Sequence, residues 1–188
     1  MAADCVADLP RIDFRNNDPD ESPNVHCKMV SVSEFERMNV SDYQFSIIHL
    51  NIRSIRKNFS LLESFLSFND DYFDVVALTE TWLCSDYDVV FQLRGYNKFS
   101  IYRNSHGGGI SVYIKKAHDA NIIADLTFVG DNFEILTLNV RNNDTNIKIA
   151  CIYRPPSNSI VDYINFLSNS LLPKLRNANC IICGDLNI

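Results

Sequence analysis

Four β-type segments follow one another in the middle of the sequence and constrain the fold more than any other feature. Each is rich in Val, Ile, Tyr and Phe and is bounded by turn-forming residues, a pattern typical of neighbouring strands. The four segments are residues 95–103, 107–116, 132–140 and 146–154. A chain with these segments is expected to bury at least one face of a β-sheet.

Further strands and two helices are predicted on either side of this block. The helices are predicted from apolar residues at helical spacing. The flanking strands cover residues 45–51, 72–80 and 180–188, and the helices cover residues 58–68 and 160–176. Strands with helices between them predict a layered α/β fold in which helices cover the sheet.

Residues 1–44 differ in composition from the rest of the chain. They contain nine Asp or Glu against four Lys or Arg and show no helical or strand period. We therefore predict a flexible acidic leader ahead of a single domain at residues 45–188. No apolar stretch approaches the roughly 20 residues that cross a bilayer, and no basic signal peptide opens the chain. The expected location is intracellular, in the nucleus or the cytoplasm.

The distribution of charge limits how the chain could contact nucleic acid. The net charge is −6, but the predicted domain has 14 acidic and 13 basic residues and is nearly neutral. It lacks the strong basic excess of a dedicated nucleic-acid binder. Contact with DNA would rely on local clusters such as Arg53 with Arg56 and Lys57, or Lys115 with Lys116. Solvated surface charge is an equally good interpretation of these clusters.

Three predicted strands end in an acid or an amide. These residues are Asn51, Glu80 and Asp185, and Asn187 follows Asp185 by two positions. In α/β sheets sites collect at strand ends, so the four residues could share one site. Their oxygens are hard ligands suited to Mg²⁺ or Mn²⁺. In extended backbone Asp185 and Asn187 would point the same way, although each residue alone is more often a turn former.

Five motifs in a fixed order carry a family resemblance. They are H-L-N-I-R-S, L-T-E-T-W-L, Y-R-(x)₃-G-G-G-I-S-V-Y-I, C-I-Y-R-P-P and G-D-L-N-I. Residues 45–188 resemble the endonuclease domain that precedes reverse transcriptase in LINE-like (non-LTR) retrotransposons. That domain belongs to the endonuclease/exonuclease/phosphatase superfamily. The resemblance implies the N-terminal part of a four-layer α/β sandwich, in which two mixed β-sheets are flanked by helices.

The resemblance also implies a role for each candidate residue. Glu80 matches the metal-binding glutamate, and Asn51 matches an asparagine that helps hold metal and phosphate. Asp185 matches the aspartate that orients or deprotonates the attacking water. Tyr153 and Asn187 match groups that contact the phosphate. The implied activity is Mg²⁺- or Mn²⁺-dependent nicking of DNA, with DNA as substrate and the downstream reverse transcriptase as a partner.

The chain departs from the family pattern in its second half. The late S-D-H-type motif has no counterpart here, because every histidine precedes Cys151. His49, within the first predicted strand, is interpreted as a structural histidine whose hydrogen bonds are satisfied. Because the catalytic groups of that motif have no counterpart, we expect the chain by itself to be inactive or nearly so. We also expect poor solubility or self-association from an uncovered apolar sheet face.

Other interpretations stay open at this point. A phosphatase or sphingomyelinase of the same superfamily could carry the same G-D-L-N core, and a non-catalytic remnant could bind a partner instead. Tyr153 could be a core aromatic. Gly107, Gly108 and Gly109 are interpreted as a hairpin turn with permissive backbone, because no helix follows them to form a phosphate cradle.

Overall fold

The computed structural model describes residues 45–68, 73–103, 107–156 and 160–187. All of them belong to one compact unit, Ser41–Ile188. The predicted acidic leader, residues 1–44, lies outside the described residues. Within the described ranges no helix is both long and apolar enough to span a bilayer.

The first sheet has four strands in the order β1-β2-β4-β3. β1 and β2 are parallel and are joined by helix α2, while β4 runs antiparallel to both β2 and β3. The elements are β1 (Ile47–Asn51), α2 (Ile55–Phe68), β2 (Val75–Thr79), the 3₁₀ helix η2 (Ser85–Val90), β3 (Tyr96–Ile101) and β4 (Ile110–Lys115). A parallel pair needs such a crossover, and α2 supplies it.

The second sheet has the order β5-β7-β8-β9, with β6 pairing β7. β7 and β8 form a long antiparallel hairpin, and β9 lies parallel to β8 after a helical crossover. The elements are β5 (Asp119–Ile122), η3 (Ala124–Leu126), β6 (Phe128–Val129), β7 (Glu134–Asn142), β8 (Thr145–Tyr153), α3 (Ile160–Phe166), η4 (Leu167–Leu171), α4 (Leu172–Leu175) and β9 (Cys180–Asp185).

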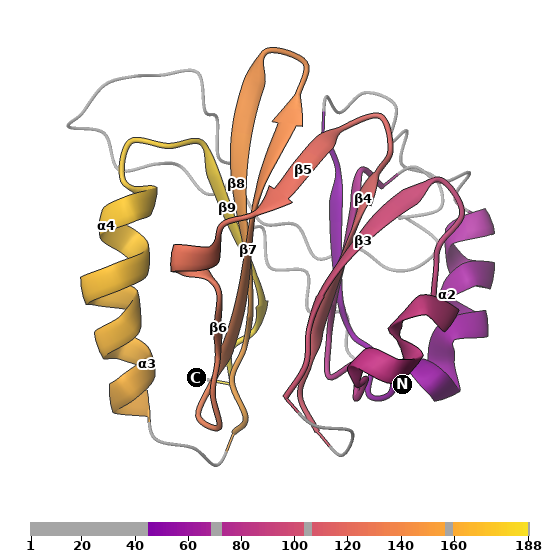
Figure 1. The fold of residues 1–188 in the computed structure, drawn as a ribbon, viewed down its shortest axis with the longest axis horizontal. Helices are drawn as coiled ribbons and strands as arrows, with labels where there is room; N and C mark the ends of the chain where they lie inside the picture. Colours follow the sequence, from indigo (N-terminus) through magenta and orange to yellow (C-terminus); the bar gives the residue numbers. More distant parts are fainter. Residues whose placement is uncertain (1–44, 69–72, 104–106, 157–159, 188) are drawn as a thin grey trace, which may run out of the picture. The chain divides into compact units, whose positions relative to one another are not determined.

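The two sheets pack face to face, with helices on their outer sides (Figure 1). Alternate residues of β2, β4, β7 and β8 fill the core between the sheets, among them Val75, Val112, Leu136 and Cys151. The opposite face of β7 and β8 packs against the helical crossover, and Ile152 and Leu171 belong to one hydrophobic cluster there. The predicted α/β architecture of two mixed sheets covered by helices is confirmed.

Several details differ from the sequence-based expectation. Helix α2 begins at Ile55 rather than Asn58, because Ile55 N donates to Thr81 O and joins the helix start to the loop after β2. The helix predicted at residues 160–176 contains a π-helical turn at Leu167–Leu171. Strands β5 and β6 were not predicted; they are only four and two residues long, and their residues are mostly exposed.

Candidate active site

The carboxyl ends of strands from both sheets meet at one edge of the core. Ile47 of β1 and Cys183 of β9 pack against the core between the sheets, and Tyr153 of β8 belongs to it. Because side chains alternate along a strand, Asn51 and Asp185 project to the same side as these residues. The two sheets thus bring together candidate residues that are far apart in the sequence.

Asn51, Glu80 and Asp185 form one hydrogen-bonded cluster. Asn51 Nδ2 donates to Glu80 Oε1 at 2.9 Å and to Asp185 Oδ2 at 2.6 Å. Two carboxylates on one amide nitrogen repel each other, and the amide N–H groups offset that repulsion. Three of the five predicted site residues are therefore in direct contact.

The backbone around Glu80 has an unusual conformation. Glu80 and Trp82 both have φ of +54°, a region that costs energy for a residue with a side chain. Hydrogen bonds to neighbouring loops hold this segment, including Ser54 N to Glu80 O at 2.8 Å and Thr81 N to Gly109 O at 3.2 Å. Strained backbone of this kind is common at functional sites.

Tyr153 joins the same cluster from inside the core. Its residue is only 5% exposed, and its hydroxyl lies close enough to the Glu80 carboxylate to feel its charge. Burial and the nearby negative charge of Glu80 raise the pKa of Tyr153 to about 12, so the phenol keeps its proton at neutral pH. The core interpretation of Tyr153 is confirmed, and its contact with a phosphate stays a prediction.

Asn187 makes a separate set of contacts. Its φ is +45°, so the backbone is not extended at Asn187 and the condition for a shared orientation with Asp185 is not met. Asn187 Nδ2 donates to Arg154 O at 2.7 Å, and Arg154 Nη2 donates to Asn187 O at 2.8 Å. Arg154 N also donates to Asp185 O at 3.0 Å. The Y-R-P-P and G-D-L-N motifs are thereby joined to each other.

The cluster offers the oxygen ligands that a hard divalent cation prefers. Glu80 and Asp185 supply carboxylate oxygens, and Asn51 can present its amide oxygen after a half-turn of the amide. Among the described residues no group of three His, Cys, Asp or Glu is placed to hold a metal, so a site here would combine the two carboxylates with the Asn51 amide oxygen and water. The residues present fit Mg²⁺ or Mn²⁺, with Glu80 and Asn51 as the expected ligands.

A sequence profile of the Endonuclease/Exonuclease/phosphatase family matches residues 48–188. The chain belongs to this family. It therefore has the fold of phosphodiester hydrolases, a family whose members typically use divalent metals. A search of curated protein sequences finds no significant match.

Several solved structures share the fold of this chain at low sequence identity. The endonuclease domain of TRAS1, a telomere-specific non-LTR retrotransposon, has a TM-score of 0.57 at 16% identity, covering 76% of this chain and 60% of that domain. The AP endonuclease LMAP from Leishmania major has a TM-score of 0.54 at 20% identity, with coverage of 85% and 63%. The 3′ phosphatase NExo from Neisseria, bound to a product DNA hairpin, has a TM-score of 0.57 at 13% identity, with coverage of 76% and 57%. The chain spans about six tenths of the length of these structures.

His49 was predicted to be a structural histidine, and the glycine segment was predicted to form a turn. His49 Nε2 lies 3.1 Å from Thr79 Oγ1, and burial lowers the pKa of the ring, so His49 is a satisfied structural histidine as expected. Gly108 and Gly109 have φ of +66° and +83°, which agrees with a permissive turn entering β4.

Glu134 was not predicted as a functional residue. It lies at the start of β7 opposite Tyr153 and is fully buried. Burial raises its pKa to about 7, although the Gly109 N–H and the Arg103 charge act in the opposite direction. In the sequence the only signal was an acid at the start of an apolar run, which resembles an ordinary strand boundary.

The raised pKa of Glu134 predicts a pH dependence of stability. The folded protein holds this proton between its ordinary pKa of 4.5 and about 7, so the free energy of unfolding falls as pH rises through that window. At about 1.4 kcal/mol per pH unit, the loss is on the order of 3 kcal/mol. Urea unfolding at pH 5 and pH 8 is expected to show this difference in the wild type and a smaller one in Glu134→Gln. An equal difference in both proteins would contradict the assignment.

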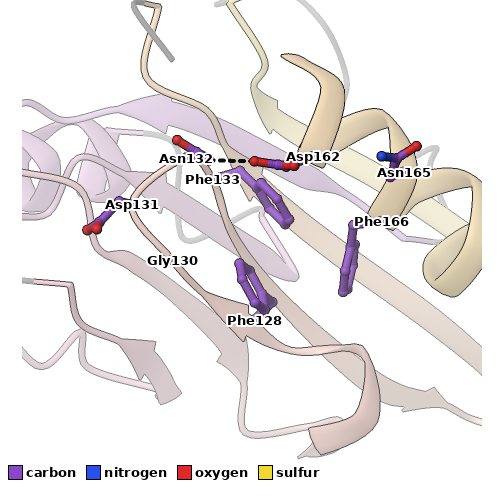
Figure 2. Close-up of a pocket in the computed structure, with 8 residues that line it drawn as sticks. All are labelled: Phe128, Gly130, Asp131, Asn132, Phe133, Asp162, Asn165 and Phe166. Carbon is purple, nitrogen blue, oxygen red and sulfur yellow. Dashed lines mark hydrogen bonds between the residues drawn. The ribbon is translucent and has the colours of Figure 1, made fainter. Parts of the chain in front are cut away.

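A surface pocket of about 310 Å³ lies at the β6–β7 turn, apart from the cluster (Figure 2). The rings of Phe128, Phe133 and Phe166 line it, and Asn132 Nδ2 donates to Asp162 Oδ2 at 2.8 Å at its rim. With Asp131 and Asp162 as its charged lining residues, it is a poor site for a phosphate.

Proposed function

We propose that this chain provides the metal- and phosphate-binding part of a DNA endonuclease from a non-LTR retrotransposon, which hydrolyses one phosphodiester bond to nick target DNA. The observation that carries the proposal is the contact of Asn51 with both Glu80 and Asp185 at 2.9 and 2.6 Å. The Y-R-P-P motif and the fold shared with the TRAS1 endonuclease domain support the retrotransposon branch. DNA is the proposed substrate and the element's reverse transcriptase the proposed partner.

The residues have distinct proposed tasks. Asp185 accepts the proton of the attacking water, because its carboxylate lies at the open end of β9 beside the metal ligands. Tyr153 donates its hydroxyl proton to a non-bridging phosphate oxygen, which its raised pKa permits at neutral pH. Asn51 and Glu80 hold the cation. A divalent cation bound there stabilises the negative charge that develops on the phosphate.

Asn187 has the proposed task of holding a phosphate oxygen. One N–H of its amide already donates to Arg154 O, and an amide nitrogen carries a second N–H. The hydrogen bonds between Arg154 and Asn187 hold this amide in place. The second N–H is the proposed donor to the phosphate oxygen.

The test is relaxation of supercoiled plasmid in Mg²⁺. Because the chain spans about six tenths of its solved relatives, the assay is run on this chain and on a version extended to their length. The extended protein is expected to produce nicked circles with Mg²⁺ and none with EDTA. Glu80→Ala and Asp185→Ala are each expected to lower the rate about 100-fold or more. Nicking that survives both substitutions would contradict the assignment.

A phosphatase assay separates the proposal from its rival in the same family. Release of phosphate from 3′-phosphorylated DNA without nicking would favour a phosphatase, a reaction consistent with the fold shared with NExo. Absence of both reactions, together with absence of metal binding, would favour a non-catalytic binding domain.

A further inference from the structure

One fully buried carboxylate lies next to the proposed site without being part of it. Glu134 lies on the face between the sheets, opposite Tyr153 in the β7–β8 register. Gly109 N donates to its Oε2 at 2.6 Å, and Arg103 Nε lies 3.3 Å from its Oε1. We call Arg103, Gly108, Gly109 and Glu134 the Glu134 network.

The two glycines of the network leave no room for a side chain. A Cβ at Gly108 would lie 2.1 Å from Glu134 Oε1, and one at Gly109 would lie 2.6 Å from Thr81 Oγ1. Both distances are far inside van der Waals contact. The glycine segment is therefore packed between Glu134 of the second sheet and Thr81, which follows β2 of the first sheet.

The same glycines hold the backbone that carries Glu80. Thr81 N donates to Gly109 O at 3.2 Å, and Trp82 N donates to Gly108 O at 3.0 Å. Since Glu80 and Trp82 both have φ of +54°, this conformation needs support from outside the segment. The two hydrogen bonds to the glycines supply part of that support.

Stability alone does not account for a carboxylate at the position of Glu134. Replacing a buried ion pair with apolar residues of similar volume is often neutral or stabilising. The carboxylate does provide an acceptor for Gly109 N–H and a partner for Arg103, whose Nη1 also donates to Asp131 O at 3.2 Å. The network thereby joins the β6–β7 turn to the loop that carries Glu80.

We propose that Glu134 is a positioning residue for Glu80. Through Gly108 and Gly109 it fixes the backbone of Thr81 and Trp82, and this orients the Glu80 carboxylate toward Asn51. The inference rests on the proposed function, since it takes Glu80 as a metal ligand. Substituting a residue that holds a metal ligand without itself binding the metal commonly lowers metal affinity about 10- to 100-fold.

The test measures Mn²⁺ affinity through Trp82, the only tryptophan in the chain. Quenching of its fluorescence reports metal bound beside Glu80 in the full chain. Glu134→Leu leaves Arg103 and the Gly109 N–H without their acceptor, so it is expected to lower the melting temperature and to weaken Mn²⁺ binding about 10-fold or more. Glu134→Gln keeps an acceptor for Gly109 N–H and is expected to restore most of the affinity.

Thr137→Val is the matched control. Thr137 is also fully buried on β7, and its Oγ1 donates to Leu126 O at 2.7 Å, on the side away from the cluster. It is expected to lower the melting temperature without changing Mn²⁺ affinity. Wild-type affinity in Glu134→Leu, or affinity that follows melting temperature across all variants, would overturn the positioning role.

A metal-free measurement separates this inference from the proposed function. If the wild type binds no Mn²⁺, the proposed function fails, and the amide NMR shifts of Thr81 and Trp82 then decide the positioning role. They are expected to change in Glu134→Leu, and unchanged shifts would overturn it. Should Glu134→Leu not fold, Arg103→Gln takes its place, with the same expected direction and the same contradicting result.

Discussion

A Gly184→Ala variant is expected to lose about 4 kcal/mol or more of folding free energy, the range of severe backbone clashes. Gly184 is in β9 beside Ile152 of β8, and a Cβ there would lie 1.9 Å from Ile152 O. The obstacle is backbone, so no rotamer change relieves it. The φ of +143° is also one that other residues rarely adopt. Urea unfolding followed by far-UV circular dichroism measures the loss.

Gly95→Ala is the matched control for this prediction. Gly95 also has positive φ, +85°, but nothing lies within 4 Å of an added Cβ. The control is expected to cost about 1–2 kcal/mol from its backbone conformation alone. Equal losses in Gly184→Ala and Gly95→Ala would show that contact between β8 and β9 is not as close as described.

Asn51→Asp is expected to destabilise the metal-free protein by about 1–2 kcal/mol, because Asn51 is exposed and solvent screens the added charge. The substitution replaces an amide that donates to Glu80 and Asp185 with a third negative charge in the same place. Adding Mg²⁺ is expected to recover most of this loss, because three carboxylates bind a hard cation well. Thermal melts with EDTA and with Mg²⁺ measure both effects.

Asn51→Ala separates charge repulsion from the loss of hydrogen bonds. It removes both donors and adds no charge, so its metal-free loss is expected to be smaller than that of Asn51→Asp. Its recovery with Mg²⁺ is also expected to be smaller, since it adds no ligand oxygen. If Asn51→Asp were as stable as the wild type in EDTA, Asn51 would not lie between the two carboxylates.

The strands and the candidate residues at their ends could be predicted from the sequence because these signals are local. Apolar runs ending in Asn51, Glu80 and Asp185 predicted both the strands and a shared site, and the last two do accept hydrogen bonds from the first. The contacts of Asn187 could not be predicted, because its orientation depends on a backbone turn and on Arg154, 33 residues earlier. Spacing alone does not reveal such a contact.

The contacts of Gly108 and Glu134 could not be predicted for a related reason. A glycine run is compatible with any tight turn, and it becomes specific only when β7 places a carboxylate 2.1 Å from where a Cβ would be. An acid that begins a strand is usually exposed, whereas Glu134 is buried by the opposite sheet. Both features are set by packing between sheets, which a single sequence does not specify.

The most direct test of the central claim is the stoichiometry and affinity of Mn²⁺ binding by this chain, measured by electron paramagnetic resonance. If Asn51, Glu80 and Asp185 form one divalent-metal site, the wild type binds one Mn²⁺ that Mg²⁺ displaces. Glu80→Ala is then expected to weaken binding about 100-fold, with a similar loss in Asp185→Ala. Absence of Mn²⁺ binding by the wild type, or undiminished binding in both variants, would contradict the account.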